Sequence, residues 1–73
     1  MAQPKFVICT DNSGYEVSLE PRKLYQVVQD DQAGSLNQIR VIDESGEDYL
    51  FPTHLFVHVD LPASVADQVA HAA

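Results

Sequence analysis

A proline separates two apolar segments near the C-terminal end of the chain, in the run Leu-Phe-Pro-Thr-His-Leu-Phe-Val at residues 50–57. Proline fixes its own φ and has no backbone N–H, so it stops a central strand and favours a tight turn. The run therefore predicts a strand that ends at Pro52, a single 3₁₀ turn, and a short last strand that begins at Phe56. Together with the strand-like segments upstream, this step is typical of a small β-barrel.

Short β-rich segments separated by turn residues make up most of the remaining sequence. The predicted strands are residues 5–10, 24–29, 38–42, 49–51 and 56–59. In the acidic turn at residues 43–48, Gly46 is predicted to take the left-handed conformation that a hairpin requires. Because 73 residues are too few for a two-sheet sandwich, we expect residues 1–60 to form one five-stranded barrel.

The inward-facing side chains of this barrel can be predicted from the alternation of apolar and polar residues along each strand. A slip of one residue would reverse every assigned face. The residues predicted to face the core are Phe6, Ile8, Val17, Leu19, Val27, Ile39, Val41, Leu50 and Val57.

A short helix is predicted for residues 61–73, with Pro62 in its first turn. Leu61, Val65 and Val69 recur at a spacing of four and form an apolar stripe. A helix of about twelve residues is marginally stable alone in water. We therefore expect this stripe either to dock on the barrel or to leave the helix frayed.

The charge balance limits the partners of the chain. Eleven acidic residues against four basic ones give a net charge of −7, which disfavours binding to nucleic acid or to an anionic membrane. The same charge fits either simple solubility or the docking of a basic protein segment. A monomer or a weak homodimer is compatible with this surface.

The sequence contains no motif that supports catalysis. Cys9 stands in a β-rich segment without a neighbouring cation, which predicts a buried small hydrophobe. His54 and His58 are four residues apart, but a turn between them and the lack of a cysteine partner argue against a metal site. The acids at residues 43–48 are interpreted as a solvated hairpin turn. We therefore expect a protein that is not an enzyme and that has no cofactor.

The lone cysteine excludes an intrachain disulfide, and no run of about 18 apolar residues could span a membrane. The N-terminus also lacks the apolar core of a signal peptide. A cytoplasmic location is the resulting expectation.

The order of these elements resembles the SH3 fold. Residues 11–19 stand where that fold has its RT loop, residues 30–37 where it has its n-Src loop, and residues 52–56 where it has its 3₁₀ turn. The resemblance implies an all-β, five-stranded SH3-like barrel with a 3₁₀ turn before the last strand and a short C-terminal helix. The chain has no tryptophan, which peptide-binding SH3 domains use to hold polyproline ligands.

Two motifs are similar to small bacterial SH3-like proteins of unassigned function. They are Asp-Asn-Ser-Gly-Tyr at residues 11–15 and Arg-Val-Ile-Asp-Glu-Ser-Gly-Glu-Asp-Tyr at residues 40–49. This resemblance implies a fold and brings no activity with it.

If the RT and n-Src loops flank one groove, as the SH3 resemblance implies, acidic residues from both loops converge there. The predicted function is a non-catalytic protein-interaction module or small accessory subunit, whose acidic groove docks a basic segment of a partner. The predicted partner-binding residues are Asp11, Tyr15, Glu16, Glu20, Asp30, Asp31 and Pro52. The alternative is a regulatory domain that senses a metal or small ligand through His54, His58 and the acids.

Overall fold

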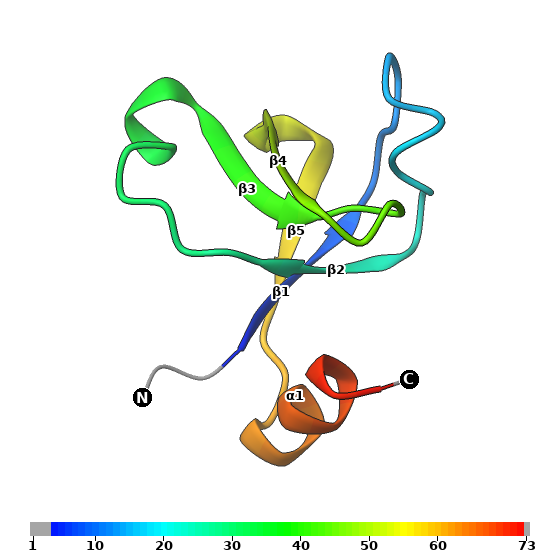
Figure 1. The fold of residues 1–73 in the computed structure, drawn as a ribbon, viewed down its shortest axis with the longest axis vertical. Helices are drawn as coiled ribbons and strands as arrows, with labels where there is room; N and C mark the ends of the chain where they lie inside the picture. The colour runs from blue at the N-terminus through cyan, green and yellow to red at the C-terminus, as the bar shows by residue number, and fades with distance from the viewer. Residues whose placement is uncertain (1–3, 73) are drawn as a thin grey trace.

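The computed structural model describes residues 4–72, which form one antiparallel five-stranded sheet and a short C-terminal helix (Figure 1). The elements are β1 (Lys5–Cys9), β2 (Leu24–Val27), η1 (Gly34–Leu36), β3 (Gln38–Ile42), β4 (Asp48–Pro52), η2 (Thr53–Leu55), β5 (Phe56–Val59) and α1 (Ala63–Ala70). The structure confirms the predictions of five strands, of a 3₁₀ turn after Pro52, and of a C-terminal helix. The predicted ends of the barrel domain at Met1 and of the helix at Ala73 lie outside the described residues.

Strand β1 is the centre of the fold because it pairs with both β2 and β5. Lys5 to Ile8 lie opposite β2, with Phe6 facing Gln26, and the other edge of β1 pairs Phe6 with Val59. The sheet order is therefore β4-β3-β2-β1-β5, which leaves β4 and β5 at the two edges. No helix in the part of the chain from residue 4 to residue 72 is long and apolar enough to cross a membrane.

The core lies on the inner face of the curved sheet. The register places Val7 opposite Tyr25, and Ile39 opposite Phe51, on this face. The thiol of Cys9 is buried there, as predicted, and burial raises the pKa of that thiol. The buried core residues are Val7, Cys9, Leu19, Tyr25, Ile39, Val41, Phe51, Leu55 and Phe56.

The predicted register is wrong in β1, β4 and β5. In β1, Val7 and Cys9 belong to the core cluster, while Phe6 and the half-buried Ile8 lie on the opposite face. Leu50 and Val57 are exposed, and their neighbours Phe51 and Phe56 are buried in their place. The rings of Phe51 and Phe56 meet edge to face with their centroids 6.2 Å apart. An aromatic ring buries more apolar area than leucine or valine, so the register with both rings inside is favoured.

The prediction that Val17 faces the core is also wrong, since its side chain is 94% exposed. Residues 15–19 form consecutive turns, in which the backbone N–H of Leu19 donates to the carbonyl of Tyr15 over 2.9 Å. The strand alternation of inward and outward side chains therefore does not apply to residues 15–19, although Leu19 is buried as predicted.

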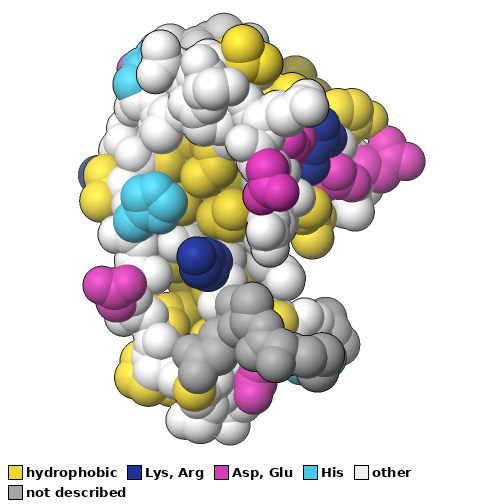
Figure 2. Space-filling model, turned by 90° about the vertical axis from the view of Figure 1, so that its left-hand side faces the viewer, with side chains coloured by type: hydrophobic (Ala, Val, Ile, Leu, Met, Phe, Trp, Pro, Cys, Tyr) yellow, Lys and Arg dark blue, Asp and Glu magenta, His cyan; other side chains and the backbone are white. Residues whose placement is uncertain are grey.

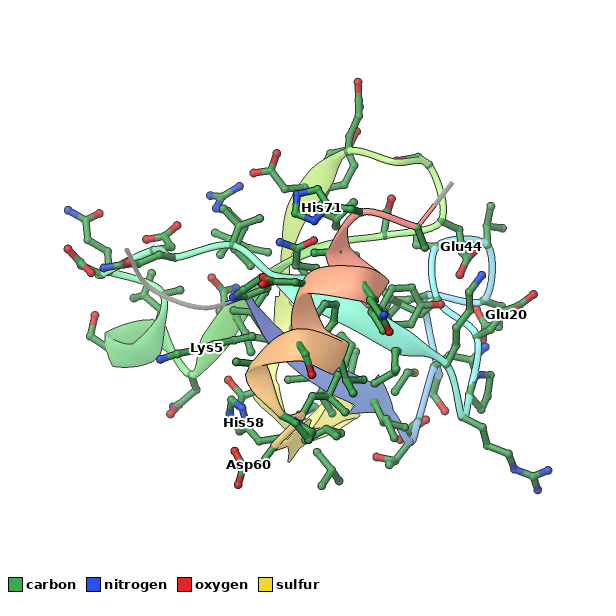
Figure 3. The ribbon with its side chains drawn as sticks, turned by 90° about the horizontal axis from the view of Figure 1, so that it is seen from below. Lys5, Glu20, Glu44, His58, Asp60 and His71 are labelled. Atoms are coloured by element: carbon green, nitrogen blue, oxygen red, sulfur yellow. The ribbon has the colours of Figure 1, made fainter. Side chains whose placement is uncertain are left out.

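The outer face of β1 is covered by α1, which lies below the sheet in Figure 1 and in front of β1 in the view of Figure 3. Phe6 is buried as predicted, but it is not part of the inner cluster, since it alternates with Val7 along β1. On the helix, Ala66 is 1% exposed and Val65 is exposed, which corrects the predicted stripe.

Candidate functional site

A hollow of about 400 Å³ lies where the loop between β1 and β2 meets the β3–β4 hairpin. We call it the tyrosine groove. The backbone N–H of Glu44 in the hairpin donates to the carbonyl of Ser18 in the loop over 3.1 Å, which joins its two walls. The residues that line it are Tyr15, Ser18, Asp43, Ser45, Tyr49, Leu50 and Phe51.

The apolar floor of the tyrosine groove is built on Phe51. The ring of Tyr15 meets the ring of Phe51 edge to face, with centroids 5.3 Å apart. Tyr49 and Leu50 remain open to solvent beside this pair, and Tyr49 is 47% exposed. The half-buried ring of Tyr15 and the exposed ring of Tyr49 are therefore available to a ligand on one small surface.

Local hydrogen bonds hold the acids of the β1–β2 loop in place. Asp11 Oδ1 accepts hydrogen bonds from the backbone N–H and the hydroxyl of Ser13, at 2.9 and 2.6 Å. Glu16 Oε1 accepts the backbone N–H of Gly14 over 3.0 Å. These bonds lower the pKa of both carboxyl groups, with the Ser13 hydroxyl the largest cause for Asp11. Gly14 suits this turn because its φ is +87°.

The hairpin that forms the other wall is organised by Asp43, whose side chain is buried. Its Oδ1 accepts hydrogen bonds from the backbone N–H and hydroxyl of Ser45, at 2.8 and 2.5 Å. Gly46 has a φ of +84°, which confirms its predicted left-handed conformation. The prediction of a solvated acidic turn is wrong for Asp43, because its carboxylate is buried and accepts the backbone N–H of Ser45.

The Tyr25 hydroxyl connects the loop to the hairpin at a second point. The Tyr25 hydroxyl donates to Glu44 Oε2 over 2.6 Å and accepts the backbone N–H of Glu20 over 2.7 Å. Lys23 Nζ lies 2.7 Å from Glu44 Oε1. Burial, followed by the Glu44 hydrogen bond, raises the pKa of Tyr25. Lys23, followed by Tyr25, lowers the pKa of Glu44.

This network predicts a pH dependence of stability. Because the pKa of Glu44 in the folded chain lies below its ordinary value of 4.5, folding stabilises the ionised carboxylate. Its contribution is present above pH 4.5 and is lost as the pH falls through the lowered pKa. The Glu44→Gln variant should therefore be less stable than the parent at neutral pH, and the difference should narrow in acid. Urea unfolding at a series of pH values measures this, with Asp31→Asn as an exposed-acid control. A difference that stays constant with pH would contradict the prediction.

The structure separates the two loops whose acids were expected to converge. In Figure 1 the β1–β2 loop and residues 28–37 lie on opposite sides of the molecule. Asp30 Oδ2 binds Arg40 Nε over 3.0 Å and lines a second cavity, which shares no residue with the tyrosine groove. The exposed Asp31 follows Asp30 on that side.

The remaining predicted site residues fall near the tyrosine groove without all lining it. Tyr15 lines the groove, and Pro52 is half-buried in β4 opposite Gln38. Glu20 is exposed at the end of the β1–β2 loop. Sequence reasoning missed Tyr49 and Leu50. The sequence signal for them is a tyrosine directly after a short hairpin turn, but using this signal requires the correct register of β4.

Among residues 4–72, no group of three or more His, Cys, Asp or Glu side chains is arranged to hold a metal ion. Comparison of the chain with protein-family models, with curated proteins and with solved structures finds no match. The chemistry that the tyrosine groove offers is recognition: aromatic faces attract cations, and nearby carboxylates attract them further.

Proposed function

We propose that this protein is a non-catalytic interaction module whose tyrosine groove binds a basic segment of a partner protein. The observation that carries the proposal is the exposed Tyr49 beside the Tyr15–Phe51 contact, on a chain of net charge −7. Aromatic residues beside a depression are typical anchors of protein interfaces.

The charges around the groove support a basic ligand. Lys23 pairs with Glu44, and Arg40 pairs with Asp30 and Asp48. Four other exposed acids on the loop and hairpin have no lysine or arginine partner within 4.0 Å in residues 4–72. They are Asp11, Glu16, Glu20 and Glu47. Exposed ion pairs contribute only about 0–1 kcal/mol each, so the tyrosines would supply affinity while the acids supply attraction and orientation.

The position of β4 supports an extended conformation of the bound segment. This strand is at an edge of the sheet, so one side of its backbone is free of a neighbouring strand. Tyr49 and Leu50 belong to the same strand and point to opposite faces. An added strand could therefore form main-chain hydrogen bonds and place alternate side chains against the groove.

The proposed architecture of the module is an SH3-like barrel. Supporting this are the consecutive antiparallel pairing of β1 to β4, the return of β5 to β1, and the 3₁₀ turn η2 before β5. The fold class by itself does not define a ligand. The proposed function therefore depends on the groove.

Fluorescence anisotropy with a labelled short peptide of alternating Arg and Val residues tests the groove. We expect saturable binding that weakens as salt rises from about 0.05 to about 0.5 M, because salt screens exposed charges. Tyr49→Ala should weaken binding by about tenfold, equivalent to about 1.4 kcal/mol. Val57→Ala, an exposed apolar residue on the opposite edge strand, is the matched control.

Two results would refute the proposed site. One is equal binding of a peptide in which Glu replaces every Arg. The other is an affinity that Tyr49→Ala and Val57→Ala change by the same factor.

A further inference from the structure

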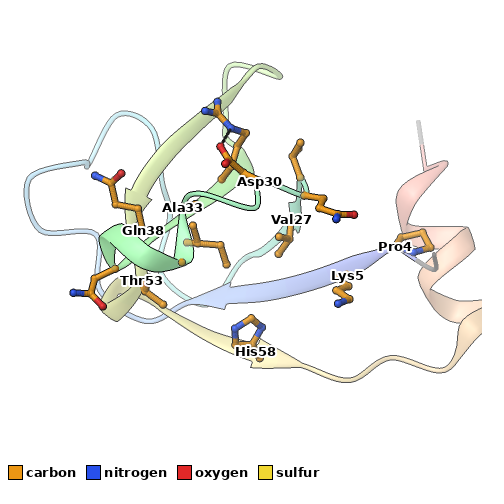
Figure 4. Close-up of a pocket in the computed structure, with 14 residues that line it drawn as sticks. Pro4, Lys5, Val27, Asp30, Ala33, Gln38, Thr53 and His58 are labelled. Carbon is orange, nitrogen blue, oxygen red and sulfur yellow. Dashed lines mark hydrogen bonds and ion pairs between the residues drawn. The ribbon is translucent and has the colours of Figure 1, made fainter. Parts of the chain in front are cut away.

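A second and larger cavity, of about 690 Å³, opens between the start of β1, β5 and the turn that carries η1. Figure 2 shows the side of the molecule on which residues 28–37 lie, and hydrophobic side chains form the bottom of a hollow there. A histidine and a basic side chain stand at its rim. Figure 4 shows the same cavity with Val27, Ala33 and His58 around it.

The strand register explains why basic side chains stand at this cavity. Lys5 lies opposite Val27, and His58 lies opposite Val7, so both are on the inner face of the sheet. The apolar core ends at Val7, and Lys5 and His58 continue the same face at the mouth of the cavity. Two polar side chains thus occupy positions that alternation would otherwise assign to the core.

The floor of the cavity is apolar. Val27 packs against the core, and Ala33 and Ile39 are buried and line the same space. Asn37 and Thr53 supply amide and hydroxyl groups at its edge. A cavity of this size with an apolar floor and a few polar groups is typical of small-molecule sites, which span about 300–1,000 Å³.

The charges at the cavity favour an anion. Arg40 is already bound by two carboxylates, since its Nε lies 3.0 Å from Asp30 Oδ2 and its Nη1 lies 3.2 Å from Asp48 Oδ2. Lys5 has no carboxylate within 4.0 Å in residues 4–72. Lys5 is therefore a cation at this cavity without a salt bridge to any of the residues 4–72, on a protein whose net charge is −7.

We propose that this cavity binds a small amphipathic carboxylate. The aliphatic body of the ligand packs on Val27, Ala33 and Ile39, and its carboxylate accepts hydrogen bonds from the Lys5 ammonium group and the His58 ring. This site is separate from the tyrosine groove, because the two share no lining residue.

Removing the charge of Asp60 is expected to change the affinity in the opposite direction to removing the charge of Lys5. Lys5 also lines a smaller hollow of about 340 Å³, and Asp60 lines that hollow too. Figure 3 shows Asp60 on the same side of the molecule as Lys5 and His58. The Asp60 carboxylate competes with a bound carboxylate for Lys5, so its removal should strengthen binding.

The experiment is an amide NMR titration of the full chain with hexanoate, and with hexanamide as the uncharged counterpart. Hexanoate should cause saturable shifts at Val27, Ala33 and Ile39, whereas hexanamide should bind at least about tenfold more weakly. Lys5→Gln should weaken hexanoate binding by about tenfold, and Asp60→Asn should strengthen it. Lys5 is exposed at the start of β1, so the Lys5→Gln variant should fold as the parent does. A native-like spectrum of the variant would verify this.

Arg22→Asn is the matched control, because it removes one exposed positive charge away from the cavity. Asparagine tolerates the left-handed conformation of Arg22, whose φ is 69°. This variant should bind hexanoate as the parent does. Equal binding of hexanamide, equal weakening by Arg22→Asn, or the absence of saturable shifts would overturn the proposal. None of these results bears on the proposed function, which the Arg-Val peptide and the Tyr49→Ala variant test separately.

Discussion

Replacing Phe51 with alanine is expected to lower the free energy of unfolding by about 3–5 kcal/mol. The Phe51 side chain is 3% exposed and contacts the rings of Tyr15 and Phe56 edge to face. Alanine would remove all of these contacts and leave a cavity in the centre of the core. A domain of this length is stable by only about 4–11 kcal/mol, so the variant should be close to unfolding at room temperature.

Chemical denaturation followed by circular dichroism measures this effect, with Leu50→Ala as the control. Leu50 is adjacent in β4 but 36% exposed on the other face, so its replacement should cost about 1 kcal/mol or less. If the Leu50 variant were the less stable of the two, the register of β4 would be the reverse of the one described.

Deleting residues 61–73 is expected to lower the free energy of unfolding by about 1.5–3 kcal/mol, which is the value of burying one phenylalanine. The reason is that α1 covers the outer face of β1, where Phe6 is only 4% exposed. Without the helix, the ring of Phe6 would face water. The exposed apolar surface should also promote self-association at high protein concentration.

Thermal melting and sedimentation velocity measure the two consequences of this deletion. A chain shortened only after Ala70, the last residue of α1, keeps the helix and should melt as the full chain does. If the chain lacking residues 61–73 also melted and sedimented as the full chain does, the helix would contribute nothing to the fold.

The order of strands and turns could be predicted from the sequence because each signal is local. Pro52 ends a strand, Gly46 makes a hairpin turn, and the structure shows both features. The faces of β1, β4 and β5 could not be predicted in the same way. Each strand has adjacent apolar residues, Phe6 to Cys9 in β1, Leu50 with Phe51 in β4 and Phe56 with Val57 in β5, so alternation permits either register. Only the packing of aromatic rings across the sheet decides between them.

The residues of the candidate sites could likewise be predicted only where the sequence around them was sufficient, and not where their position depends on the tertiary fold. Tyr15 could be assigned to a groove only through the resemblance of its loop to the RT loop of the SH3 fold. Asp30 and Asp31 could not be placed, because the position of their loop depends on how the whole sheet curves. Lys5 did leave a signal: it precedes Val7 and Cys9 at a spacing of two, which places a cation on the core face. Its role depends on His58, which only the tertiary fold brings close.

The ladder between β3 and β4 places Ile39 directly opposite Phe51. Ile39 lines the larger cavity and Phe51 lines the tyrosine groove, so two recessed surfaces of one small domain share a dividing wall. Protein interiors are close-packed, so a change of volume on one side of such a wall displaces the other side. For protein engineering, this means that neither hollow can be reshaped at this pair independently. A library built at Ile39 is also a library for the groove, and should be screened against both ligands.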